Sequence, residues 1–575
     1  MLNSSQKTAP LPQPCMILQR IAQHARQTPD APALQGSRET LSYAQLQARI
    51  QALSLRLQAS GFSQLGLLMD NGPDWIICQL AAMAADLCVV PVPLFFSAAQ
   101  TRHLLDSCDL ELLLCDQPSR LEALGIEASP LADLYSGAFR RRESGRLSPP
   151  LSRPHGTRLI TFTSGSTGQP KGVCLSTASL DLLCHSLYLQ IEPLQIERHT
   201  SLLPLSVLLE HVAGVLLSLY AGAQCSIYGS ERTGLTGSGQ LDPSAFTALL
   251  QHSQPQSLIL VPELLQALVG LAAQGQIPES LRFVAVGGGP VAPQILRQAQ
   301  QLGLPVYEGY GLSECGSVVS LNTPQQQRAG SVGRPLSHCE VKLSEQQEIL
   351  VRGAAMLGYL GDSEPSAVSR HTPQKSGRGA AMLDSSGKLG KSLSTTEPPV
   401  ESPAEWLATG DIGHLDDAGF LSIQGRKGNV LINSFGRNLS PEWIEAELCA
   451  SPAIDQACLF GDARPFNIAL LTPATDATPK AIDDWIEQLN GRLPDYARVS
   501  DWISSRAPFS AANSLLTSNG RLRRDAIHNA YQQAVEQRYQ RRLAAPTSPA
   551  QPHFQPDTQP QRQPSPQLGG NQEPL

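Results

Sequence analysis

Short apolar runs alternate with helical repeats along the first half of the chain. Residues 42–61 place apolar side chains at helical spacing and end at a glycine. The intervening runs have the length of buried parallel strands, and they lie at 65–70, 87–93, 110–116, 158–163, 255–262 and 280–290. This alternation predicts doubly wound α/β layers, in which helices cover both faces of a largely parallel sheet.

The pattern changes in the second half. Residues 339–353 resemble two strands joined by a polar turn, which predicts a small antiparallel sheet or barrel. Residues 426–543 combine two helix-like segments with two strand-like ones, at 443–448, 480–493, 454–462 and 467–473. We therefore expect a large N-terminal domain, 1–425, of doubly wound α/β layers plus a small β-barrel, followed by a small α+β C-terminal domain.

Two segments lack the large apolar side chains that a packed core needs. Residues 363–403 are rich in Ser, Pro, Gly and Lys, and residues 544–575 alternate Pro and Gln. Such segments cannot bury enough surface to offset the entropy lost on ordering. We expect a disordered insertion at 363–403 and a disordered tail at 544–575.

Two long apolar stretches are candidates for membrane spans. The stretch 75–96 is interrupted by Gln79, Asp86 and two prolines, and 202–222 carries Glu210 and His211 near its middle. A spanning helix needs about 20 apolar residues with few or no charges. Both stretches are better interpreted as buried helices, and the first continues into a buried strand.

Composition narrows the range of functions. The net charge of -7 argues against a nucleic-acid-binding protein, which usually carries a basic face. The 12 Cys include no CxxC pair, so neither a zinc ribbon nor a disulfide framework is indicated. Reduced thiols are typical of cytoplasmic proteins, and the N-terminus has no signal-peptide pattern, so we expect a cytoplasmic location.

A loop rich in Ser, Thr and Gly follows the strand-like run at 158–163. Residues 161–172 read TFTSGSTGQPKG, so small residues allow close approach of the backbone and Lys171 adds a positive charge. This composition favours a bound phosphate, although a surface turn has similar residues. The spacing differs from the Walker motif, because Pro170 occupies the position of its second glycine.

Further marked loops follow in order along the chain, at 286–290 (VGGGP), 306–314 (VYEGYGLSE), 408–445 (beginning ATGD) and 515–527 (LLTSNGRLRRDAI). Each is weak evidence alone, because Tyr310, Asp411 or Arg426 could have an ordinary structural role. Together they provide what a magnesium nucleotide requires: anion donors, a metal-binding carboxylate, an aromatic platform and an acceptor for the ribose hydroxyls.

In this order the motifs resemble those of the adenylate-forming, or AMP-binding, enzymes, which include acyl-CoA synthetases, luciferases and the adenylation domains of peptide synthetases. The resemblance covers about residues 20–362 and 404–543. Residues 425–445 are most similar to the long-chain fatty acyl-CoA synthetases. The chain is therefore expected to contain a mobile C-terminal domain that turns on a hinge at 427–429.

The resemblance also implies roles for individual residues. A phosphate cradle is implied for Thr163, Ser164, Gly165, Ser166, Thr167, Gly168 and Lys171. Contacts with the adenine nucleotide are implied for Gly287, Gly288, Gly289, Glu308, Gly309, Tyr310, Gly311, Ser313, Asp411 and Arg426. Of these, Tyr310 and the three consecutive glycines would enclose adenine, and Asp411 would accept from the ribose. Glu314 would bind Mg²⁺, and Thr163, Lys171, Glu314 and Arg521 would be the catalytic residues.

The implied reaction uses ATP to activate a carboxylic acid. Attack of the carboxylate on the α-phosphorus gives an acyl-adenylate and pyrophosphate, and catalysis consists mainly of positioning and charge neutralisation. The acyl group then passes to the thiol of CoA. A phosphopantetheinyl carrier protein is the alternative acceptor, and the sequence does not distinguish the two. A Walker-type or protein-kinase-type phosphotransferase is disfavoured because those motifs are absent from the sequence.

Two positions depart from the family pattern. The C-terminal loop holds Arg521 where the family has Lys, and this exchange alters shape and hydrogen bonding. Either Arg521 performs the same task with altered geometry, or adenylation is slow and the protein mainly uses preformed adenylates or is a degenerate homologue. In the acid-pocket segment, Val207 stands where related synthetases often have His, and His211 lies four residues later, as a displaced pocket wall or as a core residue. No Asp lies in 203–215, so a fatty or aryl acid without an amine is expected.

Overall fold

The computed structural model describes residues 15–142, 150–163, 170–236, 240–353, 355–362, 406–429, 431–432, 438–517 and 520–544. By its internal contacts the chain forms two units, Met1–His528 and Asn529–Leu575. The second unit contains the larger part of helix α14 (Arg524–Ala544). The predicted insertion at 363–403 and almost all of the predicted tail lie outside the described residues, and the domain boundary at 425 stays a prediction.

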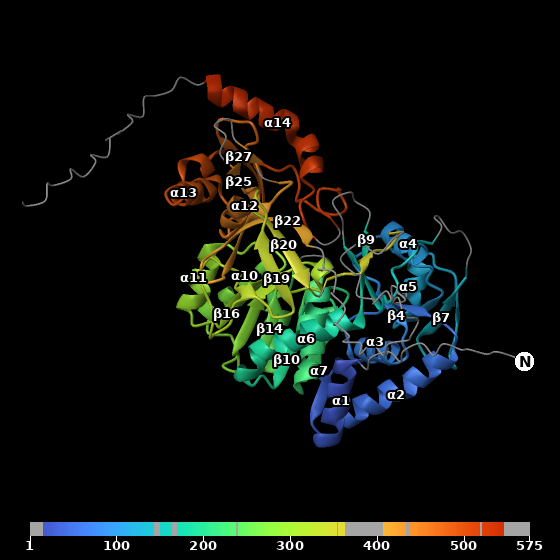
Figure 1. Ribbon diagram of the computed structural model, residues 1–575. Helices are drawn as coiled ribbons and strands as arrows, with labels where there is room; N and C mark the ends of the chain where they lie inside the picture. Colours follow the sequence, from blue (N-terminus) through green and yellow to red (C-terminus); the bar gives the residue numbers. More distant parts are fainter. Residues whose placement is uncertain are drawn as a thin grey trace, which may run out of the picture. The chain divides into compact units, whose positions relative to one another are not determined.

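The first unit contains a nine-stranded sheet whose central pairs are parallel (Figure 1). Its strands in spatial order are β18 (Arg334–Pro335), β17 (Ser320–Leu321), β16 (Val306–Tyr310), β15 (Phe283–Val286), β14 (Ser257–Leu260), β10 (Arg198–Ser201), β11 (Gln224–Ile227), β1 (Pro32–Gln35) and β2 (Thr40–Ser42). The outer pairs β1–β2, β16–β17 and β17–β18 are antiparallel. This arrangement places the carboxyl ends of β14, β15 and β16 side by side.

An eight-stranded mixed sheet forms a second layer system. Its order is β21 (Gly358–Tyr359), β9 (Lys171–Leu175), β8 (Leu159–Thr163), β4 (Cys88–Pro91), β3 (Gln64–Leu68), β5 (Leu112–Cys115), β7 (Ala138–Arg141) and β6 (Ala128–Pro130). Strands β5, β3, β4 and β8 pair in parallel, as their apolar sequences predicted. The loop predicted to hold phosphate connects β8 to β9, but its residues 164–169 lie outside the described part of the chain.

Smaller sheets complete the first unit. A four-stranded antiparallel sheet stands where a small sheet or barrel was predicted, with strands β19 (Cys339–Leu343), β20 (Glu348–Gly353), β22 (Leu407–Leu415) and β23 (Leu421–Arg426). A three-stranded sheet holds β26 (Ile454–Phe460), β27 (Asn467–Pro473) and β28 (Val499–Ser504). Two-stranded ribbons are formed by β12 (Leu235–Thr236) with β13 (Gln240–Leu241) and by β24 (Leu431–Ile432) with β25 (Asn438–Leu439).

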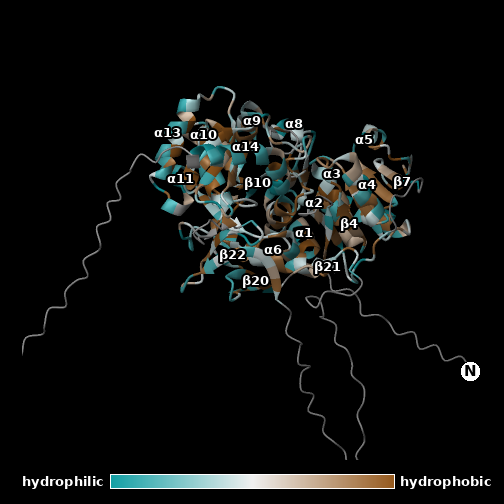
Figure 2. Ribbon diagram, turned by 90° about the horizontal axis from the view of Figure 1, so that it is seen from above, coloured by the Kyte–Doolittle hydropathy of each residue, from teal (hydrophilic) through white to brown (hydrophobic). Residues whose placement is uncertain are grey.

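Helices cover the two large sheets, and Figure 2 shows brown hydrophobic strands between helices of mixed colour. The helices of the first 300 residues are α1 (Met16–Gln27), α2 (Tyr43–Ala59), α3 (Pro73–Ala84), α4 (Ala98–Ser107), α5 (Pro118–Ala123), α6 (Thr177–Ile191), α7 (Leu217–Ala221), α8 (Ser230–Thr233), α9 (Pro243–Ser253), α10 (Pro262–Ala273) and α11 (Pro293–Gln301). Helices α12 (Pro441–Cys449) and α13 (Pro479–Asn490) pack near the three-stranded sheet. Short 3-10 turns occur at Glu192–Leu194, Ser313–Cys315 and Asp495–Ala497.

Local sequence explains where several helices begin. Helix α2 starts with a capping box, because the Ser42 hydroxyl accepts from the Gln45 amide and the Gln45 side chain accepts from the Ser42 amide. Helices α3, α10 and α11 each have Pro in the first turn, where no amide donor is needed. The stretch 75–96 forms α3 and then the buried strand β4, as expected.

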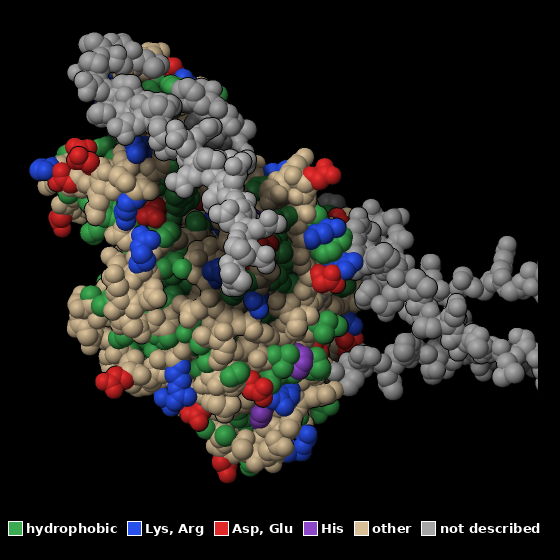
Figure 3. Space-filling model, turned by 60° about the vertical axis from the view of Figure 1, so that its left-hand side comes forward, with side chains coloured by type: hydrophobic (Ala, Val, Ile, Leu, Met, Phe, Trp, Pro, Cys, Tyr) green, Lys and Arg blue, Asp and Glu red, His purple; other side chains and the backbone are tan. Residues whose placement is uncertain are grey.

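The stretch 202–222 contains an eight-residue π-helix, η2 (Leu209–Leu216), which continues into α7. A π-helix has one extra residue per turn, and such segments are frequent at functional sites. Within the described residues, no helix is both long enough and apolar enough to cross a membrane. The face of the molecule in Figure 3 shows acidic and basic side chains interspersed rather than a basic patch.

Candidate active site

A large cavity of about 4220 Å³ opens along the carboxyl edge of β14, β15 and β16. Ligand sites commonly occur at this edge in α/β sheets. All of the described residues that were predicted to act on ATP line it, namely Thr163, Lys171, Gly287, Gly288, Gly289, Glu308, Gly309, Tyr310, Gly311, Ser313, Glu314, Asp411, Arg426 and Arg521. Ser164, Gly165, Ser166, Thr167 and Gly168 lie outside the described residues. The cavity exceeds the size of a site for one small ligand, so it has room for several substrates.

Glycine is required at the start of the turn after β16. A Cβ atom on Gly311 would lie 1.7 Å from the carbonyl oxygen of Ser317, so any other residue would displace the backbone. The glycines after β15 are less constrained by their neighbours, but Gly288 has a φ of 82°, which favours glycine. Both turns therefore present bare backbone to the cavity, as expected for contact with a flat ring.

Asp411 is the centre of a hydrogen-bonded group on β22. The Tyr310 hydroxyl donates to Asp411 Oδ2 at 2.6 Å, and Arg426 Nε lies 2.8 Å from Oδ1. Strands β22 and β23 pair so that Asp411 stands opposite Arg426. Burial raises the pKa of Asp411, and the Arg426 charge opposes that shift. The sequence named all three residues but did not indicate that they bind one another.

Arg521 lies in the same cavity, on the loop between β28 and α14. Its backbone closes a tight turn, because the amide of Thr517 donates to the Arg521 carbonyl at 2.7 Å and the Arg521 amide donates to Thr517 Oγ1 at 3.0 Å. Burial and the charge of Arg426 lower the pKa of Arg521, and the charges of Asp411 and Glu314 oppose this shift. Arginine nevertheless stays cationic in proteins, so the loop carries a positive charge into the cavity.

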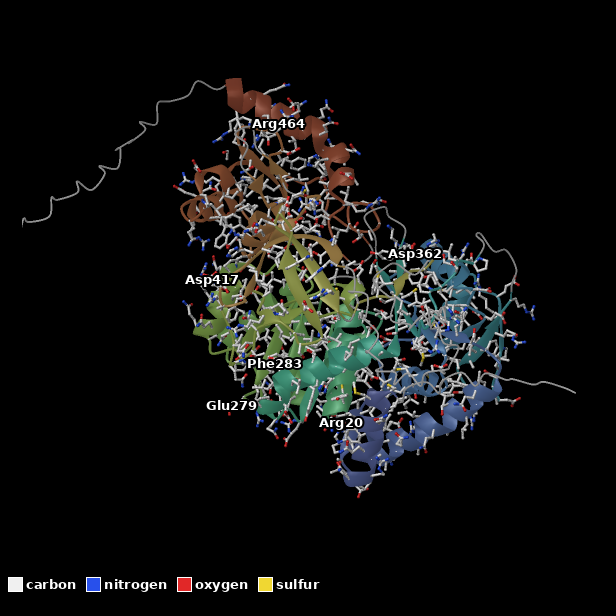
Figure 4. All side chains as sticks on the ribbon, in the orientation of Figure 1. Arg20, Glu279, Phe283, Asp362, Asp417 and Arg464 are labelled. Carbon is white, nitrogen blue, oxygen red and sulfur yellow. The ribbon has the colours of Figure 1, made fainter. Side chains whose placement is uncertain are left out.

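Glu314 and Lys171 are joined through a residue that the motif analysis did not single out. The Tyr359 hydroxyl donates to Glu314 Oε1 at 2.8 Å, and Lys171 Nζ lies 5.8 Å from the centre of the Tyr359 ring. The neighbouring residue Asp362, labelled in Figure 4, accepts from the Tyr359 amide at 2.8 Å. Burial and the Glu314 charge raise the pKa of Tyr359, so its hydroxyl keeps its proton and donates.

The described residues fit a metal ion that is carried by a nucleotide. Within them, no group of three or more His, Cys, Asp and Glu side chains could hold a metal on its own. Mg²⁺ usually binds through one or two carboxylates together with phosphate oxygens. Glu314 provides such a carboxylate. The Tyr359 hydroxyl donates to its Oε1 atom and not to its Oε2 atom.

Glu308 has an unusual environment on β16. Burial raises the pKa of its carboxyl to about 7 from 4.5. Folding therefore favours the protonated form of Glu308. Its contribution to the free energy of unfolding is greatest below pH 4.5 and decreases as the pH rises towards 7. We expect Glu308→Gln to stabilise the protein relative to the wild type at pH 8 more than at pH 5. Urea unfolding at both values measures this difference, and parallel pH profiles for the two proteins would contradict the expectation.

The two predicted acid-pocket residues have different positions. Val207 lines the cavity, whereas His211 is 1% exposed and does not line it. The His211 ring packs edge-on against Trp75 with centroids 5.0 Å apart, and burial lowers its pKa to about 3. His211 thus lies in the core as a neutral side chain. Its Nε2 atom has no hydrogen-bond partner among the described residues.

A different histidine, His199 on β10, borders the cavity. Its Nδ1 lies 2.9 Å from Ser257 Oγ and its Nε2 lies 2.9 Å from Glu210 Oε1. Glu210 is fully buried, and its other oxygen accepts from the amides of Leu202 and Leu203. This network ties the π-helix η2 to β10 and β14. The sequence showed Glu210 only as a charge in an apolar run.

On the cavity face of the sheet, the side chains are small at the carboxyl edge and become larger towards the beginning of the strands. The parallel register aligns Ala285 with Ile259 and Tyr307, and it aligns Phe283 with Ser257. Gly287 and Gly309 lie nearest the carboxyl edge, whereas Phe283, labelled in Figure 4, begins β15 and stacks on Tyr307 at 5.2 Å. Helix η2 faces β10 and β14, and Leu209 and Ala213 line the same cavity. We call this part of the cavity, lined by Leu209, Ala213, Ile259, Phe283 and Ala285, the apolar groove.

Comparisons with known proteins agree with this arrangement. The AMP-binding enzyme family matches residues 21–360, and the AMP-binding enzyme C-terminal domain matches residues 428–543. The indoleacetate–CoA ligase of Aromatoleum aromaticum is 26% identical over 518 residues, which cover 83% of this chain and 91% of that protein. Long-chain-fatty-acid–CoA ligase 6 of Rattus norvegicus is 23% identical over 564 residues, which cover 83% and 78%. These ligases of an aryl acid and of fatty acids are similar to the chain to about the same degree.

A solved structure shows the same fold. The o-succinylbenzoate CoA synthetase of Bacillus subtilis, in complex with its acyl-adenylate intermediate, superimposes with a TM-score of 0.67 at 22% identity and covers 90% of this chain and 98% of that one. The predicted α/β architecture and the resemblance seen in the motifs are both confirmed. With family models that match most of its length, the chain belongs to the AMP-binding enzyme family.

Proposed function

We propose that the protein is an ATP-dependent acid–CoA ligase that works through an acyl-adenylate. The observation that carries this proposal is the convergence of Asp411, Glu314, Lys171 and Arg521 on one cavity beside Tyr310. The Asp411 carboxylate suits the ribose hydroxyls, and the Glu314 carboxylate suits a metal ion. The positive charges of the other two residues suit phosphates. The names of the relatives, which are CoA ligases, support the same reaction class.

In the first half-reaction, a carboxylate oxygen of the acid attacks the α-phosphorus of ATP. The bond between the α-phosphorus and the bridging oxygen breaks, and pyrophosphate leaves with the electron pair. Arg521 and Lys171 both line the cavity, and we propose that their positive charges neutralise the oxygens that become more negative in the transition state. Mg²⁺, when bound, supplies further neutralisation of the phosphate charge.

In the second half-reaction, the CoA thiol attacks the acyl carbon and loses its proton to solvent. AMP leaves with the former carboxylate oxygen. We propose that the apolar side chains lining this part of the cavity help to exclude water from the mixed anhydride between the two steps. The predicted hinge lies at the end of β23, where Lys427 Nζ is 2.8 Å from Glu348 Oε2 and Asn429 Nδ2 donates to Glu442 Oε1 at 2.6 Å. We propose that these contacts hold one of the two positions of the C-terminal domain.

We propose that the acid lies in the apolar groove beside Val207 and Ala285, with its carboxylate towards Arg521. Glu210, the one acidic residue of the segment 203–215, bonds to His199, is fully buried and does not line the cavity, so it is not available to a substrate amine. This favours a medium- or long-chain fatty acid, or an aryl acid, over an amino acid. The similarity to ligases for both acid types supports either substrate equally.

A panel of acids tests the proposal. Acetate, octanoate, palmitate, benzoate and indoleacetate are offered singly, and acid-dependent exchange of pyrophosphate with ATP and hydroxylamine trapping of the adenylate are measured. CoA and a phosphopantetheinylated carrier protein are then compared as acceptors in one thioester assay. We expect exchange with an apolar acid and transfer to CoA. If the protein bound ATP but no acid supported pyrophosphate exchange, the proposal would be contradicted. If the acyl group were transferred to the carrier protein alone, the carrier and not CoA would be the acceptor.

The proposed ribose acceptor gives a sharper prediction. We expect Asp411→Asn to raise the dissociation constant for ATP by roughly 10- to 100-fold, because hydrogen bonds to a charged acceptor contribute about 1.5–3 kcal/mol. Isothermal titration calorimetry measures this constant. Asp416→Asn is the matched control, because Asp416 directly follows β22, pairs with Arg328 and does not itself line the cavity. Equal binding by wild type and Asp411→Asn would remove Asp411 from the nucleotide site.

A further inference from the structure

Tyr359 lies on a short strand that is fixed against the strand bearing Lys171. Strand β21 pairs antiparallel with β9, so that Tyr359 stands opposite Val173. The amide of the next residue, Leu360, donates to the Gly172 carbonyl at 2.8 Å. Tyr359 is half-buried and lines the cavity. The main chain from which the Tyr359 ring extends is therefore fixed by backbone pairing.

The same short segment also holds Glu314. The amide of Met356 donates to the Glu314 backbone carbonyl at 2.6 Å, and the Tyr359 hydroxyl donates to Glu314 Oε1 at 2.8 Å. The segment 356–359 therefore makes hydrogen bonds to both the main chain and the carboxylate of Glu314. This double contact leaves little freedom in the orientation of the carboxylate plane.

The ring of Tyr359 meets Lys171 as well. The Lys171 Nζ atom is 5.8 Å from the ring centre, within the range of a cation–π interaction. A single side chain therefore contacts both the cation beside the predicted phosphate loop and the carboxylate suited to a metal ion. Its hydroxyl serves one contact and its ring serves the other, so the two can be separated by mutation.

We propose that Tyr359 is a positioning residue that orients Glu314 for Mg²⁺ on the bound nucleotide. The inference rests on the proposed function of this cavity. With the Tyr359 hydroxyl on Oε1, the oxygen Oε2 would remain available to a metal ion, and the carboxylate would need no reorientation on metal binding. Hydrogen-bond partners of metal ligands act in this way, and their loss typically weakens metal binding 10- to 100-fold.

The test is the metal dependence of nucleotide binding, which needs no turnover. The probe is α,β-methylene ATP, whose carbon bridge cannot be cleaved in adenylation, and its binding is followed by calorimetry without metal and at rising Mg²⁺. We expect Tyr359→Phe to raise the half-saturating Mg²⁺ concentration about 10-fold. Binding of the probe in EDTA should stay within about twofold of wild type, because Phe keeps the ring under Lys171.

The chain offers a matched control and a second variant. Tyr188 also donates to a glutamate, Glu192, at 2.9 Å, but on the surface, so Tyr188→Phe should leave the Mg²⁺ requirement unchanged. Tyr359→Leu removes the ring too and should also weaken binding in EDTA. An unchanged Mg²⁺ requirement in Tyr359→Phe, or an equal loss with and without metal, would overturn the inference. Failure of the proposed function would appear separately, as absence of acid-dependent exchange in the wild type.

Discussion

Replacement of Arg521 by Ala is expected to slow formation of the acyl-adenylate roughly 10²- to 10³-fold, the typical cost of losing one preorganised group that stabilises charge in a transition state. The Arg521 backbone makes two hydrogen bonds with Thr517, one to its amide and one to its hydroxyl, so the side chain enters the cavity from a fixed point. Its neighbours there include Asp411 and Glu314. The measurement is the rate of acid-dependent pyrophosphate exchange at saturating ATP.

Arg521→Lys separates charge from shape. Lys keeps the positive charge but lacks the planar fork of donors, so we expect a smaller loss than in Arg521→Ala. Arg523, two residues along the same loop, also lines the cavity but provides the control, because its Nη1 donates to the Ser514 carbonyl of its own loop. Arg523→Ala should retain most of the exchange rate. If Arg521→Ala exchanged pyrophosphate as fast as wild type, the arginine would have no part in adenylation.

Replacement of Glu210 by Ala is expected to lower the free energy of unfolding by about 3–5 kcal/mol, because several buried hydrogen-bonding groups are left unsatisfied at about 1–3 kcal/mol each. The variant would leave His199 Nε2 and the amides of Leu202 and Leu203 buried without their acceptor. Each such loss is unfavourable because water cannot replace the missing partner. Chemical unfolding monitored by tryptophan fluorescence measures the change.

The surface residue Glu192 is the control for Glu210. Its carboxylate accepts from Tyr188 in an exposed position, so Glu192→Ala should change the unfolding free energy by less than about 0.5 kcal/mol. A loss below about 1 kcal/mol in Glu210→Ala would show that the network is dispensable for stability. Gly214 should be equally sensitive, because a Cβ atom there would lie 2.2 Å from Glu210 Oε1.

Local pattern was sufficient to predict most of the layered fold. Apolar runs such as 110–116 and 280–290 lead into or contain the buried strands β5 and β15, because a strand covered on both faces needs apolar side chains throughout. The stretch 75–96 divided correctly into a helix and a strand at its polar and proline residues. Glycine-rich turns marked the cavity edge, because only glycine allows backbone to approach as closely as at Gly311.

The sequence by itself determined the family and the residue types that face the cavity, since their order along the chain is a property of the linear pattern. Only the tertiary structure decided which of them touch. Tyr359 joins Lys171 and Glu314 from a segment 45 residues beyond the glutamate, and His199 pairs with Glu210 through the turn into a π-helix. Such contacts depend on strand register and helix geometry, which arise from packing between distant segments and leave no periodic signal in sequence.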